Sequence, residues 1–217
     1  MKQIVERALA LRVQLQGIAG YDVNTSIAAV AVSVGAERPE LRTSAAPDGT
    51  VTLLFTDIEG STALNERLGD QRWMDVLRLH NAIVRDAIAA HDGYEVKSQG
   101  DGFMIAFGSA RLALQSAIAL QRTIAEHNSV AGEPVQVRIG LHTGEAIKEA
   151  DDFYGHHVNL AARIADQARG GEILVSSLLK ELTDRAGEFR FDDGRSVDLK
   201  GLSNAQRVYE VRWREEP

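Results

Sequence analysis

The stretch Tyr94–Phe107, YEVKSQGDGFMIAF, holds two β-like runs on either side of a glycine-rich turn. Gly100 and Gly102 permit the positive φ or the close backbone approach that a tight turn requires. The pattern predicts a hairpin that presents Asp101 at its tip and carries Lys97 on the strand before the turn. An ordinary exposed turn is the alternative, because Gly-Asp-Gly is common turn chemistry.

The segments around this hairpin predict the fold. Before it, residues 51–56 (VTLLFT) form an apolar run typical of a buried strand, and an amphipathic helical stretch follows to Ala90 with a break at Gly69. After it, residues 110–127 have helical spacing and residues 135–141 alternate as a strand does. The order βαββαβ indicates an α+β fold with a ferredoxin-like core, whose antiparallel sheet carries both helices on one face. A C-terminal α/β extension follows, with a helix predicted over 156–168 and a strand over 172–176.

The N-terminal part reads as an appendage. Residues 1–20 place apolar side chains at helical spacing, and residues 35–50 gather Gly, Pro, Ser and Asp without any period. We therefore expect a helix and linker over residues 1–49, with a dimerising or regulatory role, and the main domain over residues 50–217.

Composition narrows the function classes. The net charge of −7 and pI near 5.4 argue against a general nucleic-acid binder, which needs a basic face for phosphates. The chain has no cysteine, which excludes disulfides, thiol nucleophiles and Cys-ligated zinc and fits a reducing compartment. No apolar run approaches the roughly 20 residues of a membrane span; the best candidate, residues 27–34 (IAAVAVSV), is too short. We expect a cytoplasmic chain, and a longer parent protein with membrane segments stays open.

Two aspartates are predicted to converge. Asp57 ends the first strand and Asp101 opens the third, and these strands are neighbours in a ferredoxin-like sheet. Two carboxylates without an intervening cation repel each other, so a bridging divalent metal is the simplest explanation of the pair. Oxygen ligands without cysteine favour Mg²⁺ or Mn²⁺ over zinc. The alternative is that the two aspartates only cap a helix and a turn.

Two further groups suit a phosphorylated substrate. Gly60, Ser61 and Thr62 open a helix, whose N-terminal N–H groups attract phosphate and would suit a triphosphate; an ordinary N-cap is the alternative. Asn159 and Arg163 lie four residues apart and share a helix face, where an amide and a guanidinium can hold ribose and phosphate oxygens. A surface arginine beside a solvated asparagine is the alternative for this pair.

Together these residues resemble the catalytic domain of class III nucleotidyl cyclases. The segment between Gly144 and Tyr154 is short, as in the compact bacterial subclass. Each matching stretch is modest evidence alone, whereas four in the family order are specific. They are residues 54–62 (LFTDIEGST), 97–103 (KSQGDGF), 137–145 (VRIGLHTGE) and 154–164 (YGHHVNLAARI).

The resemblance implies that ATP is converted to cyclic AMP and pyrophosphate by a head-to-tail homodimer with two shared active sites. Asp57, the carbonyl of Ile58 and Asp101 would hold two divalent cations, Mg²⁺ or Mn²⁺. Lys97 and Asp152 would bind the adenine edge, with Asp151 as the alternative to Asp152. A guanylyl cyclase usually carries Glu where Lys97 stands, which favours ATP.

By the same resemblance, Asn159 would orient the ribose and Arg163 would stabilise charge on the α-phosphate. Arg138 and Lys200 match positions that contact the phosphates. The metal-binding aspartates of one chain would then face the base-binding and ribose-binding residues of its partner. The alternatives are a catalytically silent module that binds ATP, a guanylyl cyclase, or another ferredoxin-like nucleotide enzyme such as a diguanylate cyclase or a polymerase palm.

Overall fold

The computed structural model describes residues 25–37, 39, 41, 44–145, 152–185, 187–199 and 204–214. The helix predicted over residues 1–20 lies outside these ranges, as do Asp151 and Lys200. In the part of the chain that the structure describes, no helix is long and apolar enough to cross a membrane.

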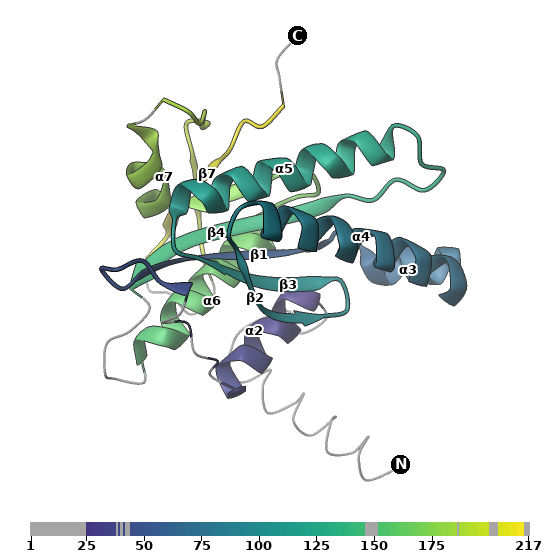
Figure 1. Cartoon of the computed structure of the whole chain (residues 1–217), viewed down its shortest axis with the longest axis horizontal. Helices are drawn as coiled ribbons and strands as arrows, with labels where there is room; N and C mark the ends of the chain where they lie inside the picture. The colour runs from purple at the N-terminus through teal and green to yellow at the C-terminus, as the bar shows by residue number, and fades with distance from the viewer. Residues whose placement is uncertain are drawn as a thin grey trace.

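A seven-stranded sheet forms the centre of the molecule, in the order β2-β3-β1-β4-β5-β7-β6 (Figure 1). The central strand β1 pairs antiparallel with both β3 and β4, while β4 and β5 run parallel. The predicted ferredoxin-like order and the pairing of the first strand with the third are therefore confirmed. The strands are β1 Thr50–Ile58, β2 Tyr94–Gln99, β3 Gly102–Phe107, β4 Val137–Glu145, β5 Ile173–Ser176, β6 Arg195–Val197 and β7 Gln206–Glu210.

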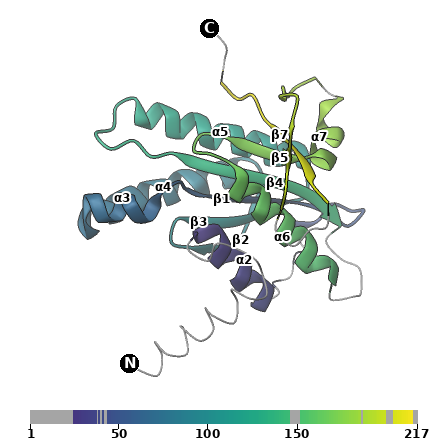
Figure 2. The ribbon, with the colours of Figure 1, turned by 180° about the vertical axis from the view of Figure 1, so that it is seen from behind.

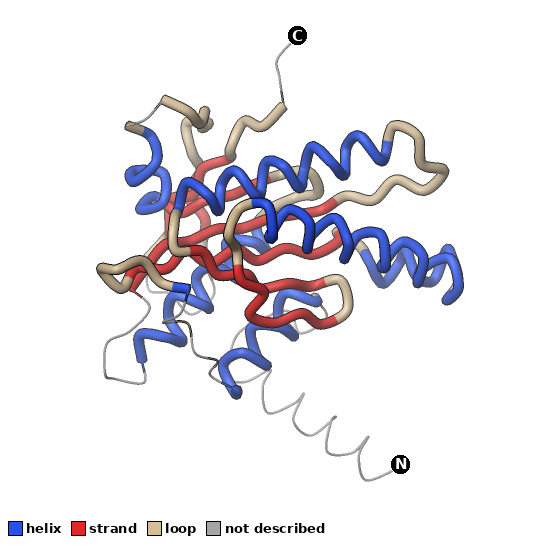
Figure 3. The backbone as a smooth tube through the Cα atoms, in the orientation of Figure 1, coloured by secondary structure: helices blue, strands red, loops and turns tan. Residues whose placement is uncertain are grey.

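Helices cover both faces of this sheet (Figures 1 and 3). Helices α4 and α5 lie on one face, as predicted, and α2 and α6 lie on the other, as Figure 2 shows from behind. The predicted break at Gly69 separates α3 from α4, and Gly69 has a positive φ of 74°. The helices are α2 Ser26–Glu37, α3 Ser61–Leu68, α4 Asp70–Ala90, α5 Ala110–Asn128, α6 Asp152–Gln167 and α7 Ser177–Asp184.

Strand β1 supplies both cores because its side chains alternate between the two faces. Leu54 and Ile58 pack with α4 and α5, whereas Leu53 and Phe55 pack with α2 and α6. Every residue from Val51 to Ile58 is buried, which explains the continuous apolar run in the sequence. The same alternation directs Asp57 to the face of α2 and α6, which is called the α6 face below.

Two glycines of β4 allow α6 to lie against the sheet. A Cβ on Gly140 would lie 2.2 Å from the backbone N of Ala165, and a Cβ on Gly144 would lie 2.4 Å from the ring of His157. Any side chain at these positions would push α6 outward. The two glycines therefore set the short distance between the sheet and α6, which carries the polar residues.

Helix α2 is the main feature that the sequence did not predict. Residues 27–34, the apolar run that is too short for a membrane span, form most of α2, and Ile27, Ala28, Val30 and Val34 are each 0% exposed. They pack against Phe55 and against β3 and α6. Part of the predicted appendage therefore belongs to the core, while β1 begins at Thr50, where the main domain was expected to begin.

Candidate active site

Asp57 forms a bidentate ion pair with Arg138. The two residues are direct cross-strand neighbours on β1 and β4, with Nε 2.6 Å from Oδ1 and Nη2 3.0 Å from Oδ2. Their side chains are 3% and 14% exposed, so the pair is largely shielded from water. Such a fork geometry fixes the carboxylate more firmly than a single contact would.

Asp101 lies in the two-residue turn between β2 and β3, where Gly100 has a positive φ of 64°. It is only 3% exposed, so this is not an ordinary exposed turn. Its Oδ2 accepts a hydrogen bond from the backbone N–H of Ile58 at 3.0 Å, and its Oδ1 accepts one from the hydroxyl of Ser26. The carboxylate therefore lies beside the end of β1, next to the residue that follows Asp57.

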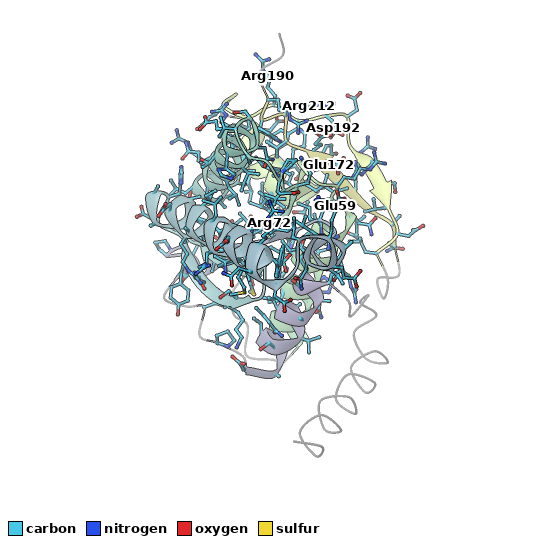
Figure 4. All side chains as sticks on the ribbon, turned by 90° about the vertical axis from the view of Figure 1, so that its right-hand side faces the viewer. Glu59, Arg72, Glu172, Arg190, Asp192 and Arg212 are labelled. Carbon is cyan, nitrogen blue, oxygen red and sulfur yellow. The ribbon has the colours of Figure 1, made fainter. Side chains whose placement is uncertain are left out.

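The charge of Asp101 acts on the pKa of Asp57. Burial raises the pKa of Asp57 above its usual value, Arg138 opposes this rise, and the charge of Asp101 adds to it. Burial lowers the pKa of Arg138, but Asp57, Asp166 and Glu59 outweigh it and raise that pKa overall. Figure 4 labels Glu59, which directly follows β1, between Arg72 and Glu172 in that view. Negative charge is thus concentrated at this end of β1.

This donor set fits a hard divalent cation. Both side chains offer carboxylate oxygens, both are buried, and the charge of Asp101 disfavours the charged form of Asp57. Within the described residues, no group of three or more His, Asp or Glu side chains could hold a metal ion. A cation at Asp57 and Asp101 would therefore need backbone carbonyl, water or substrate oxygens as its other ligands.

The segment after Asp57 turns into α3. Gly60 is the N-cap residue in the left-handed conformation, with φ 67° and ψ 25°, and no side chain caps the helix. Gly60 and Thr62 are exposed and Ser61 is half-buried, so the start of α3 faces solvent. The Gly-Ser-Thr sequence therefore does supply the N-cap, as the alternative interpretation holds, through the backbone of Gly60 and without a side-chain hydrogen bond.

Asn159 and Arg163 lie one turn apart on α6, as predicted, and both are half-buried. Val158, Ala161 and Ala162 beside them are buried against the sheet. Helix α6 thus brings an amide and a guanidinium to the same side of the sheet as Asp57. Asp152 begins this helix, but its side chain lies outside the described part.

Lys97 points to the α6 face as well, because it is the cross-strand partner of Met104, which packs there. Its Nζ lies 2.7 Å and 2.9 Å from the two carboxylate oxygens of Glu37, the last residue of α2. Lys97, on β2, and Asp101, in the turn that follows it, therefore both contact α2.

Comparison with known proteins identifies the family of this chain. The family described as adenylate and guanylate cyclase catalytic domain matches residues 43–212. The chain belongs to this family. Two solved structures show the same cyclase fold: CyaB of P. aeruginosa, described as an adenylyl cyclase, and the guanylyl cyclase Cya2. They have TM-scores of 0.65 and 0.66, identities of 26% and 28%, and cover 75% and 77% of this chain and 93% and 94% of theirs.

Curated relatives of this cyclase domain are longer proteins. An adenylate cyclase of Mycosarcoma maydis is 36% identical over 174 residues, which are 68% of this chain and 7% of the relative. An uncharacterised protein of Mycobacterium tuberculosis is 36% identical over 170 residues, 76% of this chain and 56% of its own length. The chain thus spans a small part of the fungal relative and about half of the mycobacterial one.

Sequence reasoning missed two residues that touch the site of the cyclase domain, Ser26 and Glu37. Both belong to α2, where each contacts a residue of the hairpin. A signal for this helix was present, since the buried positions 27, 28, 30, 31 and 34 follow helical spacing. That spacing shows a helix with one apolar face but not the surface that it covers.

A pair of histidines, the buried His142 and the half-buried His157, links β4 of the cyclase domain to α6. His142 Nε2 lies 2.9 Å from Nδ1 of His157, and His142 Nδ1 lies 2.9 Å from the hydroxyl of Ser176. Burial, followed by the nearby imidazoles of His157 and His156, lowers the pKa of His142 to about 3. His142 is therefore neutral. Its contact with His157 anchors α6 two residues before Asn159.

A cavity of about 280 Å³ does not coincide with this site. It is lined by the first turn of α5, by α7 and by Thr52 and Thr143, which belong to the opposite side of the sheet from Asp57. The carboxylates, and not this cavity, mark the candidate active site of the cyclase domain.

Proposed function

We propose that this chain is an adenylyl cyclase that converts ATP to 3′,5′-cyclic AMP and pyrophosphate. The observation that carries the proposal is the pair of buried carboxylates, Asp57 and Asp101, on the sheet face that also holds Lys97 and α6. The reaction needs charge neutralisation on a triphosphate and a fixed ribose, which these groups can supply together.

Asp57, the carbonyl of Ile58 and Asp101 would hold two divalent cations, Mg²⁺ or Mn²⁺. When bound, such cations supply the acidity that activates the ribose 3′-hydroxyl and the positive charge that braces the phosphates. Arg138 already balances the charge of Asp57, and it becomes available to phosphate oxygens once another cation takes that role. The start of α3 at Gly60, Ser61 and Thr62 then offers backbone N–H groups to the triphosphate.

Lys97 and Asp152 would select the base. A lysine donates to adenine N1 and a carboxylate accepts from the exocyclic amino group. Asn159 would orient the ribose, and Arg163 would neutralise charge that develops on the α-phosphate, with Lys200 on the other phosphates. Relatives named adenylate cyclase support ATP, whereas the similarity to the guanylyl cyclase Cya2 keeps GTP as the second candidate.

The active form would be a head-to-tail homodimer with two shared sites in the cytoplasm. Lys97 lies on β2 and Asp101 lies in the turn that follows it, and the two residues of one chain would serve different nucleotides. The aspartates of one protomer would instead combine with Lys97, Asn159 and Arg163 of its partner. At a net charge of −7, the two copies would associate through apolar burial and local charge pairing.

Product identification tests the proposal. Purified chain is incubated with ATP or GTP and Mn²⁺, and the nucleotide and pyrophosphate are quantified by chromatography and mass spectrometry. We expect cyclic AMP and pyrophosphate in equal amounts, and none from an Asp57→Asn, Asp101→Asn variant. Cyclic GMP as the main product would support the guanylyl alternative. Metal-dependent ATP binding without a cyclic product would support the silent module.

A further inference from the structure

Helix α2 contacts three separate residues of the candidate active site. At its first turn, the hydroxyl of Ser26 donates to Oδ1 of Asp101, and the backbone N–H of Ile27 donates to the carboxylate of Asp57. At its last residue, Glu37 holds Lys97 at 2.7 Å and 2.9 Å. One helix thus contacts both carboxylates and the lysine.

Apolar packing holds α2 in this place. Its buried side chains pack with Phe55 of β1, Met104 of β3 and the alanines of α6. The backbone approach is close, because a Cβ on Gly102 would lie 2.8 Å from the carbonyl carbon and oxygen of Ser26. The start of α2 therefore rests directly on the turn that carries Asp101, and a side chain at position 102 would collide with it.

Helix α2 contacts the same atoms that a metal ion and a nucleotide would bind. Donors from Ser26 and Ile27 use carboxylate oxygens that would bind cations, and Glu37 uses the ammonium that would bind a base. The ion pair of Glu37 and Lys97 is partly exposed, with side chains 56% and 29% accessible. It therefore orients the Lys97 side chain more than it stabilises the fold. The apolar face of α2 keeps the helix packed on the sheet, and the polar groups at its two ends occupy Asp57, Asp101 and Lys97.

We propose that α2 is an autoinhibitory helix that closes the active site of its own chain and must leave the sheet before cations and ATP bind. This inference rests on the proposed function, because it takes Asp57, Asp101 and Lys97 as the substrate and metal residues. Displacement uncovers the α6 face around Phe55 and Met104, which becomes available to a second copy of the chain. Anything that binds the released helix then raises the cyclase rate.

The test compares charges placed on the two sides of α2 in the full chain. Val34→Glu places a carboxylate at a position that is 0% exposed, whereas Ala36→Glu places the same charge at an exposed position. We expect Val34→Glu to raise the rate at low ATP by about tenfold, which is the change that about 1.4 kcal/mol of lost closure produces, and Ala36→Glu to leave it unchanged. Equal rates for the two variants and the wild type would overturn the proposal.

Two further measurements remain decisive if Val34→Glu does not fold. The double variant Ser26→Ala, Glu37→Gln removes the Ser26 hydroxyl and the charge of Glu37 but no core side chain, while the backbone N–H of Ile27 stays in place, and a severalfold rise in rate is expected. Hydrogen exchange of the α2 amides in the wild-type chain is also followed with Mn²⁺ and a non-cyclising ATP analogue. Faster exchange in α2 supports displacement, and unchanged exchange at saturating analogue overturns it.

These results separate the two proposals. If the wild type makes cyclic AMP while the α2 variants and α2 exchange do not change, autoinhibition is wrong and the proposed function stands. If α2 leaves the sheet on addition of Mn²⁺ and the analogue but no variant makes a cyclic nucleotide, the proposed function is wrong. The proposal that α2 closes the nucleotide site is then still supported.

Discussion

Arg138 engages both carboxylate oxygens of Asp57 across the β1–β4 pair, at 2.6 Å and 3.0 Å. The guanidinium balances a carboxylate that is buried beside a second one, Asp101. Arg138 therefore has a structural role, which is to neutralise the buried Asp57, in addition to its proposed contact with phosphate.

Replacing Arg138 with Met should destabilise the fold, because Asp57 would remain buried without its partner. We expect a loss of about 3 kcal/mol in the free energy of unfolding, measured by urea denaturation. Adding Asp57→Asn should recover part of the loss. Arg67→Gln is the control, since its pair with Glu133 is exposed and should change stability by about 0.5 kcal/mol or less. A loss no larger than that of the control would show that Arg138 does not have this structural role.

Gly140→Ala should weaken both the fold and catalysis. The new Cβ would lie 2.2 Å from the backbone N of Ala165, so α6 must shift together with Asn159 and Arg163. We expect a loss of about 2 kcal/mol in the free energy of unfolding and a lower cyclase rate. Gly132→Ala is the control, because a Cβ there meets nothing within 4 Å. Similar melting temperatures for the two variants would show that α6 does not need this approach.

The buried His142 should make stability depend on pH. Its pKa in the fold is about 3, below the 6.5 of an unperturbed histidine, so the unfolded chain binds a proton at pH 5 and the folded chain does not. The stability contributed by neutral His142 is present above pH 6.5 and declines as the pH falls from there toward 3. We expect a contribution of about 2 kcal/mol to the loss between pH 7 and pH 5.

Comparison with a variant isolates this contribution. His142→Gln should lose less stability between pH 7 and pH 5 than the wild type does, whereas His127→Gln, at the end of α5, should follow the wild type. Denaturation with urea at both pH values gives the difference. If His142→Gln and the wild type decline equally, another group is responsible for the pH dependence.

Mixed variants should reveal the shared sites of the proposed homodimer. Asp57→Asn and Asn159→Ala should each abolish cyclase activity alone. In a heterodimer one site carries both lesions and the other carries neither. An equimolar mixture that exchanges subunits freely should thus regain about a quarter of the wild-type rate, because half of its dimers are heterodimers with one intact site. Heterodimers that form but stay inactive would show that each site lies within one chain.

The order of the elements in the core was predictable from the sequence. The apolar run of β1, the glycine-rich hairpin and the helical spacing of α5 are local patterns, and each one reports its own element. Their order then restricts the sheet to few topologies, which is why the pairing of β1 with β3 was predicted correctly. The end positions were less accurate: β4 runs from Val137 to Glu145, four residues beyond its predicted end at 141.

The positions of Asp57, Asp101, Asn159 and Arg163 on their elements also followed from the sequence, because each stands at a strand end, at a turn or on one helix face. Tertiary structure alone decided what these side chains contact. The pairing of Asp57 with Arg138 depends on strand register, and the closeness of α6 depends on two glycines that meet residues about 13 to 25 positions away. The course of α2 over Asp101 and Lys97 depends on an apolar surface assembled from β1, β3 and α6. Helical spacing in residues 27–34 specifies an apolar face, but only the folded sheet provides the surface that this face covers.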